Sequence, residues 1–327
     1  MARQEPDRVP FMELRIDEEM EQELMQRRHF TPAELCRAIH MDGFGIDYYP
    51  PEVARREHAG DRDYVVGGAL TTRDEVSRLT LPRLDREFFS EGRRLLEEFG
   101  DEYAVFARTR LGPSYVLLNM GLEGFSYVLY EDPWIIQEVM RIYADWACEL
   151  HQALCEIGFP VIWACDDLAF KTGPFFSPNV LRELFMPGMR RIADSIKAPW
   201  IFHSDGDLSP FLDDLVSLGM NGLHPIEQGA MDIADVKSRY GDRLCVIGNI
   251  DLHYTLTLGT PEETKREVLE RILAVAPGGG YIVSSGNSIT HYCKVENVRA
   301  MVRTIHEYGE YPIDLERVRR EVRSSGR

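Results

Sequence analysis

The residues best suited to chemistry in this sequence follow short apolar runs. In IFHSDGDLSP, residues 201–210, an apolar run ends in His203, Ser204 and Asp205. His203 and Asp205 are two positions apart, so on a continuing β-strand their side chains point to the same side. Imidazole and carboxylate groups both bind zinc, and three such ligands leave an open coordination position for a substrate. The stretch therefore predicts a metal centre at the end of a strand.

Polar or ionisable side chains also follow the other apolar runs in the second half of the chain. These are Asp166 and Asp167 after VIWAC, His224 and Glu227 after NGL, Asn249 and Asp251 after LCVIG, and Asn287, His291 and Cys293 after YIVS. Buried carboxylates and imidazoles are unfavourable by several kcal/mol unless they are paired or bound to a metal. If these strands end on one face, the side chains converge there and indicate a functional site.

The third metal ligand beside His203 and Asp205 is expected to be His224 or Cys293. The structural alternative is that His203 is a hydrogen-bonded core histidine next to a helix N-cap, which needs no chemistry. Cys293 has a structural alternative as well, because its position in the loop is poorly defined by the sequence.

The paired carboxylates of Asp166 and Asp167 repel each other unless something cationic lies between them. This favours a functional role for Asp167. Asp251 follows Gly248-Asn249-Ile250, and a residue in that place either binds substrate or shapes a turn. Both interpretations of Asp251 stay open.

The elements that must position these residues alternate between strands and helices. Strands are expected at 161–165, 200–203, 221–224, 244–248 and 281–285, and helices at 178–197, 209–219, 232–240, 261–276 and 295–308. Capping signals support the helices, among them the capping box Thr260-Pro261-Glu262-Glu263. Repeated βα units predict a parallel sheet. No G-x-G-x-x-G motif follows a strand, so we expect an α/β fold of the (β/α)8 TIM-barrel type rather than a Rossmann fold.

The first half of the chain is less regular. We expect helices over 11–29 and 83–99, a first strand at 44–47, and further strands at 103–109 and 114–118. No linker or low-complexity segment interrupts the sequence. Residues 1–327 are therefore expected to form a single barrel domain, with residues 1–30 as an N-terminal helical extension.

Composition narrows the class of protein. The 327-residue chain has a net charge of −17, which argues against a nucleic-acid-binding surface, because contacts with phosphates need clustered Lys and Arg. No apolar run approaches the roughly 20 residues that span a bilayer, and the first ten residues lack the apolar core of a signal peptide. Six scattered cysteines without a C-x-x-C pair indicate reduced thiols. We expect a cytoplasmic protein that acts on a small molecule, without nucleic acid or membrane.

The motifs together resemble the uroporphyrinogen decarboxylase superfamily. The resemblance covers residues 160–308, including IFHSDGDLSP and APGGGYIVSSGNSITHYCKVENVRAMV, and continues more weakly toward PDRVPFMELRIDEEM. It implies a (β/α)8 barrel and one of two activities. One branch decarboxylates porphyrinogens without a cofactor. The other transfers methyl groups between a methyl donor, a corrinoid carried on a partner protein and a thiol, usually with zinc.

Two departures count against the decarboxylase branch. Its N-terminal motif is close to Arg-Gln-Ala-Gly-Arg, whereas MELRIDEEMEQEL contains only Arg15 among acidic residues. Such a lining repels an anionic substrate. Decarboxylases also place a histidine after the glycine of the last-strand motif, where this chain has Asn287.

The thiol-methylating branch carries His-x-Cys where this chain has His203-Ser204-Asp205. That branch has a further Cys near the last strand. At that position this chain has Asn287, and Cys293 follows six residues later. A carboxylate in place of a thiolate still permits zinc, at a harder and more Lewis-acidic site. Such a site suits an ether oxygen better than a thiol. The resemblance therefore implies zinc-assisted demethylation of a methoxylated or other small donor for a corrinoid protein.

The roles that follow are these. The expected metal ligands are His203, Asp205, His224 and Cys293, the catalytic groups are Asp167, Asp205 and Glu227, and the substrate-binding residues are Asp166, Asn249, Asp251 and Asn287.

Two other functions stay open at this point. A lyase acting on a tetrapyrrole or another carboxylate would be favoured if Arg108 or Arg110 lined the pocket. A non-catalytic barrel that binds a ligand or docks a corrinoid protein would be favoured by a pocket without metal ligands or shifted pKa values.

Overall fold

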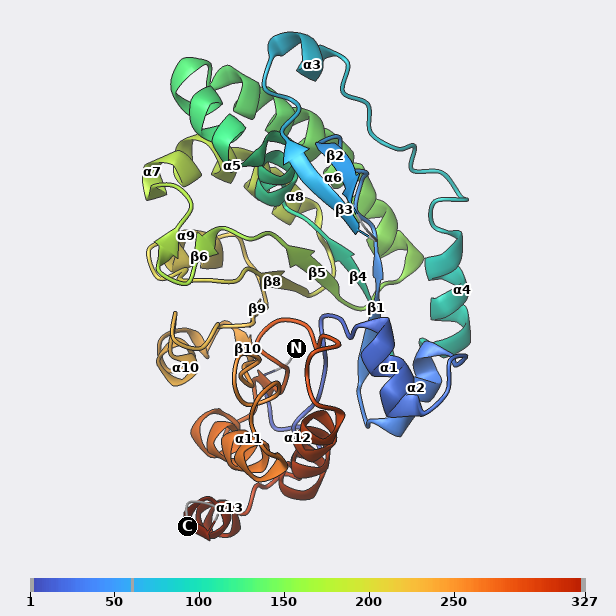
Figure 1. Ribbon diagram of the computed structural model, residues 1–327, viewed down its shortest axis with the longest axis vertical. Coiled ribbons are helices and arrows are strands. Elements are labelled where there is room, and N and C mark those ends of the chain that lie inside the picture. Colours follow the sequence, from blue (N-terminus) through green and yellow to red (C-terminus); the bar gives the residue numbers. More distant parts are fainter. Residues whose placement is uncertain (1–2, 60–61, 325–327) are drawn as a thin grey trace.

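The computed structural model describes residues 3–59 and 62–324. Within them, seven parallel strands form one curled sheet in the middle of the molecule (Figure 1). In sheet order they are β1 (Gly43–Asp47), β4 (Ala104–Thr109), β5 (Ile162–Cys165), β8 (Trp200–His203), β9 (Gly222–His224), β10 (Cys245–Ile247) and β11 (Tyr281–Ile282). Every neighbouring pair is parallel. The carboxyl ends of all seven strands, and the loops that follow them, therefore lie at one edge.

The space between β11 and β1 is filled by residues 8–16, which run as an extended segment. The N–H of Met12 donates to the carbonyl of Val283 (3.1 Å), and the N–H of Asp42 donates to the carbonyl of Phe11 (2.9 Å). Phe11 also forms a parallel bridge with Val283. This segment takes the eighth position of the barrel wall, and the predicted α/β barrel fold is confirmed.

The interior of the barrel is filled by one apolar cluster. Its members are Met12, Leu14, Phe106, Trp163, Ile201, Cys245, Ile247 and Ile282. Met12 and Leu14 point into this cluster, whereas Phe11 packs on the outer core. Such alternation is typical of an extended strand and not of a helix. The helix predicted over 11–29 is accordingly confined to α1 (Glu18–Met25).

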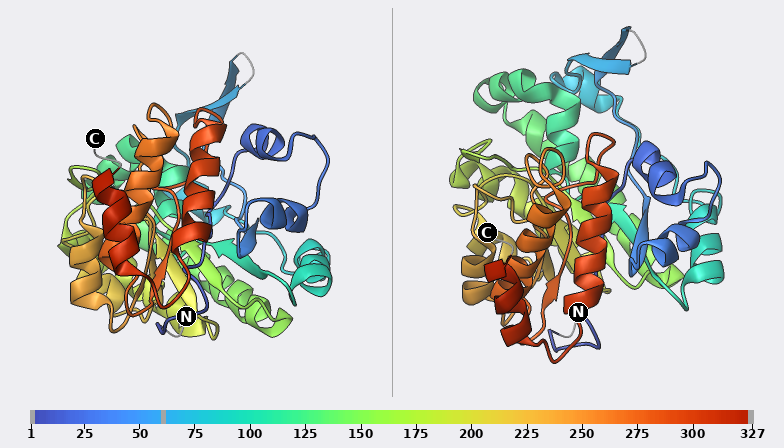
Figure 2. Two further views of the ribbon diagram at one scale, coloured as in Figure 1. Left: turned by 90° about the horizontal axis from the view of Figure 1, so that it is seen from below. Right: turned by 60° about the horizontal axis from the view of Figure 1, so that its bottom comes forward.

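Helices cover the outside of the sheet, and Figure 2 shows α11, α12 and α13 side by side along one flank. The remaining helices are α2 (Pro32–Ala38), α3 (Arg73–Ser77), α4 (Ser90–Phe99), α5 (Pro113–Glu131), α6 (Trp134–Ile157), α7 (Pro178–Val180), the π-helix η1 (Leu181–Phe185), α8 (Met186–Ser195), α9 (Leu212–Val216), α10 (Ile233–Tyr240), α11 (Pro261–Val275), α12 (Val295–Tyr308) and α13 (Leu315–Ser324). The predicted capping box of Thr260 and Glu263 starts α11. None of the helices in the described residues combines the length and apolar character that a bilayer crossing needs.

Two short antiparallel hairpins complete the fold: β2 (Arg55–Ala59) with β3 (Arg62–Gly67), and β6 (Ala169–Phe170) with β7 (Gly173–Pro174). The β6–β7 hairpin follows β5 directly. It therefore belongs to the loops at the carboxyl edge of the sheet.

The apolar run at 114–118 lies in α5, so its prediction as a strand was wrong. Pro113 occupies the first turn, where its missing N–H is no loss. The carboxylate of Asp166, at the end of β5, accepts the N–H of Ser114 (2.8 Å) and so caps the helix from another part of the chain. A short apolar run has the same appearance in a buried strand and a buried helix. The contact with Asp166 is not visible in the local sequence.

Candidate functional site

The strands deliver two histidines to the centre of the carboxyl edge. Ile201 points into the barrel interior, so His203, two residues later in β8, does the same. His203 is the register partner of His224 in β9. Both imidazoles are buried, and their Nδ1 atoms lie 2.7 Å apart.

His203 belongs to a group of three possible metal ligands with Asp167 and Asp205. Their ligand atoms all lie within 4.8 Å of one another. Nε2 of His203 is 3.7 Å from Oδ1 of Asp167, and the same oxygen accepts the N–H of Asp205 (3.1 Å). The predicted pairing of His203 with Asp205 is thus present in space, with Asp167 as the third member.

Asp205 has one oxygen without a partner. The Nδ2 group of Asn287 donates to Oδ2 of Asp205, whereas Oδ1 is buried and makes no hydrogen bond. Burial raises the pKa of Asp205 to about 6, and the nearby His203 and Asn287 act in the opposite direction. An unpartnered buried carboxylate oxygen is costly, and a divalent cation is a partner that removes this cost. The donor set therefore fits a metal ion such as zinc.

Asp205 connects this donor group to a cavity of about 310 Å³, which its side chain helps to line. Its lining includes Asp205, Glu227, Asn249, Asp251, His253 and Asn287. Glu227 accepts the N–H of Gly206 (2.9 Å) and lies 3.8 Å from Lys171 and 3.9 Å from His253. None of the described residues that line this cavity is an arginine. The cavity is consequently rich in carboxylates and poorly suited to a polyanionic substrate.

Asp166 faces away from this cavity, although it was predicted to bind substrate. Its carboxylate accepts the backbone N–H groups of Leu111, Gly112 (3.2 Å) and Ser114 (2.8 Å) at the start of α5. The side chain is fully buried, and burial raises its pKa to about 7, while the three N–H donors lower it. Its hydrogen-bonding capacity is used to hold β5 against α5.

Asn249 and Asp251 lie at the cavity but are largely occupied by protein contacts. Nδ2 of Asn249 donates to the carbonyl of Ile226 (2.6 Å), and Nε of Arg271 donates to Oδ1 of Asn249 (2.8 Å). Asp251 accepts the backbone N–H groups of residues 253–255. These contacts position the loop after β10, in agreement with the turn-shaping alternative for Asp251.

Two predicted metal ligands lie outside the group. Nε2 of His224 is 3.2 Å from the hydroxyl of Ser284, so both ring nitrogens of His224 have protein partners. Burial and the adjacent His203 hold the pKa of His224 well below its ordinary value, and a backbone hydrogen bond with Ser285 acts in the opposite direction. The thiol of Cys293 is buried and lies 3.8 Å from the hydroxyl of Thr257. The structure brings neither residue to Asp167 and Asp205.

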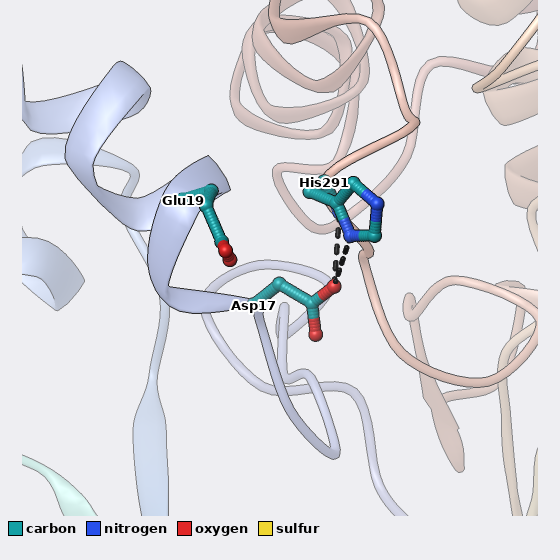
Figure 3. A group of neighbouring side chains, drawn as sticks. All are labelled: Asp17, Glu19 and His291. Carbon is teal, nitrogen blue, oxygen red and sulfur yellow. Dashed lines mark hydrogen bonds and ion pairs between the residues drawn. The ribbon is translucent and has the colours of Figure 1, made fainter. Parts of the chain in front are cut away.

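A second donor group lies nearer the surface, at the start of α1 (Figure 3). It consists of Asp17, Glu19 and His291. Nδ1 of His291 is 3.1 Å from Oδ2 of Asp17, and the N–H of His291 donates to the same oxygen (3.0 Å). Glu19 and His291 are exposed, and no atom of the group is among the buried, unpartnered atoms of the described residues. The group is explained as a surface ion pair.

The two arginines that would favour a lyase lie outside the carboxylate-lined cavity. Arg108 lines a neighbouring cavity of about 530 Å³, where its Nε pairs with Asp47 (2.5 Å) and its Nη2 donates to the carbonyl of Gly45 (3.0 Å). Arg110 stacks on the ring of Tyr49 at 4.4 Å and lies 3.7 Å from Glu52. Neither guanidinium belongs to the carboxylate-lined cavity.

Glu13 is a buried polar residue that the sequence interpretation missed. It accepts the N–H of Ser285 (2.8 Å), the hydroxyl of Ser285 (2.7 Å) and the hydroxyl of Ser284 (3.2 Å). Burial raises the pKa of Glu13 to about 8, although the three hydrogen bonds lower it. The available signal was the extended alternation of FMELRI, which the expected helix over 11–29 obscured.

The substitution Glu13→Gln is expected to remove a pH dependence of stability. Between its ordinary pKa and about 8, folded Glu13 keeps a proton that the unfolded chain releases. The free energy of unfolding of the wild type should therefore fall relative to that of the variant as the pH rises from 5 to 8, by about 1 kcal/mol per pH unit. Urea unfolding of both proteins across this range measures the difference. A difference that does not change with pH would contradict the raised pKa.

The chain is similar in sequence to decarboxylases and to methyltransferases. The sequence profile of the family described as uroporphyrinogen decarboxylase (URO-D) matches residues 66–308. The chain is 26% identical over 174 residues to a methylcobamide:CoM methyltransferase of Methanosarcina barkeri. This alignment covers 53% of this chain and 49% of that protein. The chain is also 25% identical over 255 residues to a uroporphyrinogen decarboxylase of Methylococcus capsulatus. That alignment covers 72% of this chain and 69% of the decarboxylase. The chain thus spans about half the length of the methyltransferase that it matches.

Among solved structures, a methyltransferase from Methanosarcina mazei has a similar fold. Its TM-score is 0.71 at 18% sequence identity, over 93% of this chain and 95% of that one. At this identity the likeness shows the fold alone, and it agrees with the barrel described above.

Proposed function

Because the chain belongs to the uroporphyrinogen decarboxylase (URO-D) family, we propose that it is a methyltransferase with zinc at its site. In this proposal it moves a methyl group from a small methyl donor to a corrinoid carried by a partner protein. The observation that carries this proposal is the donor group of Asp167, His203 and Asp205 with the unpartnered, buried Oδ1 of Asp205. The similarity to a methylcobamide:CoM methyltransferase supports the class of reaction.

The three residues of the donor group are the proposed zinc ligands, and His224 and Cys293 are assigned to its surroundings. Zinc bound there supplies a Lewis acid that polarises the atom bearing the methyl group. One nitrogen and two carboxylates form a harder ligand set than thiolates, which favours an oxygen-bound methyl group, as in a methoxylated compound. Asn287 orients Asp205 by donating to its second oxygen.

Glu227 is the proposed group on the substrate side of the site. It lines the cavity, and its carboxylate is held by the N–H of Gly206 (2.9 Å) at the turn after Asp205. A carboxylate fixed in this way is positioned to orient a polar substrate or to exchange a proton with it. We further propose that residues 1–327 act as one domain, because residues 8–16 form part of the barrel wall next to the site.

Decarboxylation of a porphyrinogen is not supported by the geometry. The match to a uroporphyrinogen decarboxylase is the longer of the two alignments, but the cavity is lined by carboxylates and Arg108 is paired with Asp47. A purely ligand-binding barrel would not need a group of three possible metal ligands in which burial raises the pKa of one carboxylate, that of Asp205.

The experiment that tests the proposal has two steps. Elemental analysis of the purified 327-residue chain, supplied with zinc and then dialysed, is expected to show about one zinc per chain. The zinc-loaded protein is then incubated with methoxylated aromatic compounds and reduced cobalamin, and methylcobalamin is followed by its absorbance. Methylcobalamin formation supports the proposal. A protein that holds no zinc, or that releases carbon dioxide from uroporphyrinogen instead, would overturn it.

A further inference from the structure

A line of buried polar groups runs from Glu13 to the proposed zinc site. Oε2 of Glu13 is 3.2 Å from the hydroxyl of Ser284, which is 3.2 Å from Nε2 of His224. Nδ1 of His224 is 2.7 Å from Nδ1 of His203. All four side chains are buried. The other ring nitrogen of His203, Nε2, faces Asp167 at 3.7 Å.

The chemistry of Glu13 fixes the direction of these hydrogen bonds. Above its pKa of about 8, Glu13 is an ionised carboxylate that only accepts, so the hydroxyl of Ser284 donates to it. The hydroxyl oxygen is then free to accept from Nε2 of His224. A neutral imidazole has one N–H, so Nδ1 of His224 is an acceptor and Nδ1 of His203 must donate to it. The opposite direction would deprive a buried carboxylate of a donor, at a cost of about 1–3 kcal/mol.

We propose that ionised Glu13 is a positioning residue: through Ser284 and His224 it selects the tautomer of His203 that carries its proton on Nδ1. Nε2 of His203 then presents its lone pair to Asp167 and Asp205. Metal-bound histidines commonly donate their second N–H to a protein acceptor, which fixes the ring and its tautomer. Here that acceptor is a second histidine, whose own tautomer is set by a carboxylate 271 residues away in the sequence from Ser284. The inference rests on the proposed function only in taking Nε2 of His203 as the zinc-binding atom.

Glu13→Gln is a sharp test, because it keeps the shape of the side chain and reverses the direction of the hydrogen bonds between residue 13 and His203. The N–H of Ser285 donates to Oε1 of Glu13 (2.8 Å), so the amide of the variant must place its oxygen there. Its NH₂ group then faces the hydroxyls of Ser284 and Ser285 and donates to both. The hydroxyl of Ser284 is left to donate to Nε2 of His224. Both histidines are expected to change tautomer, and Nε2 of His203 becomes protonated.

The measurement is ¹⁵N NMR of the 327-residue chain labelled at histidine, with zinc removed by a chelator, at pH 9. At this pH Glu13 is above its pKa of about 8, and imidazoles are neutral. Protonated and unprotonated ring nitrogens differ widely in ¹⁵N shift, and the signals of His203 are those that vanish in His203→Ala. We expect a protonated Nδ1 on His203 in the wild type and a protonated Nε2 in Glu13→Gln. The same tautomer in both proteins would overturn the proposal.

Two serine variants keep the test informative if Glu13→Gln folds poorly. Ser284→Ala removes the link to His224, whereas Ser285→Ala removes a hydroxyl from the same carboxylate and leaves the link in place. We expect a mixture of His203 tautomers in Ser284→Ala and the wild-type tautomer in Ser285→Ala. Equal spectra of the two variants would contradict a path through Ser284.

Zinc affinity provides the second readout. At pH 9, where Glu13 is ionised, Glu13→Gln is expected to bind zinc about 10–100-fold more weakly than the wild type, the usual effect of losing an outer-shell partner. Glu18→Gln changes an exposed carboxylate in the same part of the chain and should leave the affinity unchanged. Unchanged zinc affinity in Glu13→Gln would count against the positioning role. A wild type that binds no zinc would refute the proposed metal site, while the tautomers of His203 would still decide the role of Glu13.

Discussion

His203→Ala is expected to abolish zinc binding, from about one ion per chain to none that survives dialysis, and with it methyl transfer to cobalamin. His203 supplies the only nitrogen among the proposed ligands, and the remaining carboxylates of Asp167 and Asp205 repel each other once it is gone. Elemental analysis of the two proteins after identical zinc loading measures the effect. We expect activity to fall by at least about 10³-fold, as for loss of an essential catalytic group.

The matched control is His291→Ala. His291 belongs to the second donor group, with Asp17 and Glu19, and is exposed. Its variant should keep the zinc and the activity. If His291→Ala lost zinc and His203→Ala retained it, the metal would be assigned to the group at the start of α1. This result would refute the proposed site. Because His203→Ala also leaves Nδ1 of His224 without its partner, thermal unfolding is recorded for each variant to separate lost zinc from lost fold.

The adjacent aspartates are expected to respond in opposite ways to the same substitution. Asp166→Ala leaves the three N–H groups of Leu111, Gly112 and Ser114 without an acceptor inside the protein. Buried unsatisfied donors cost about 1–3 kcal/mol each, so the free energy of unfolding should fall by about 4 kcal/mol. The side chain of Asp167 is 51% exposed, and Asp167→Ala should change stability by less than about 0.5 kcal/mol.

Zinc affinity should show the reverse pattern. Asp167→Ala removes a proposed ligand and is expected to weaken zinc binding by at least about 10-fold, whereas the folded fraction of Asp166→Ala should bind zinc as the wild type does. Urea unfolding of the zinc-free proteins and zinc titration at low urea measure the two quantities separately. If Asp166→Ala loses zinc without losing stability, Asp166 belongs to the site and its assignment to the fold is wrong.

The sequence by itself determined the alternation of strands and helices in the second half of the chain. It also determined that β8 ends in His203, with Asp205 in the loop that follows, and that β9 ends in His224. These features depend on local information: the two-residue and 3.6-residue periods of apolar side chains, and capping residues such as Thr260 that act within one turn. The proximity of His203 to Asp205 was predictable because only one residue separates them, although Asp205 lies beyond the end of β8.

Only the tertiary structure decided how the barrel closes and what each carboxylate does. Residues 8–16 are extended because their hydrogen-bond partner Val283 lies at the other end of the chain. Asp166 and Asp167 are chemically identical neighbours, yet the backbone N–H groups at the start of α5 occupy the first and leave the second beside His203 and Asp205. Glu13 meets Ser284 across the closed barrel. A side chain's role depends on which polar groups are unsatisfied around it, and a period or a cap carries no information about groups that distant.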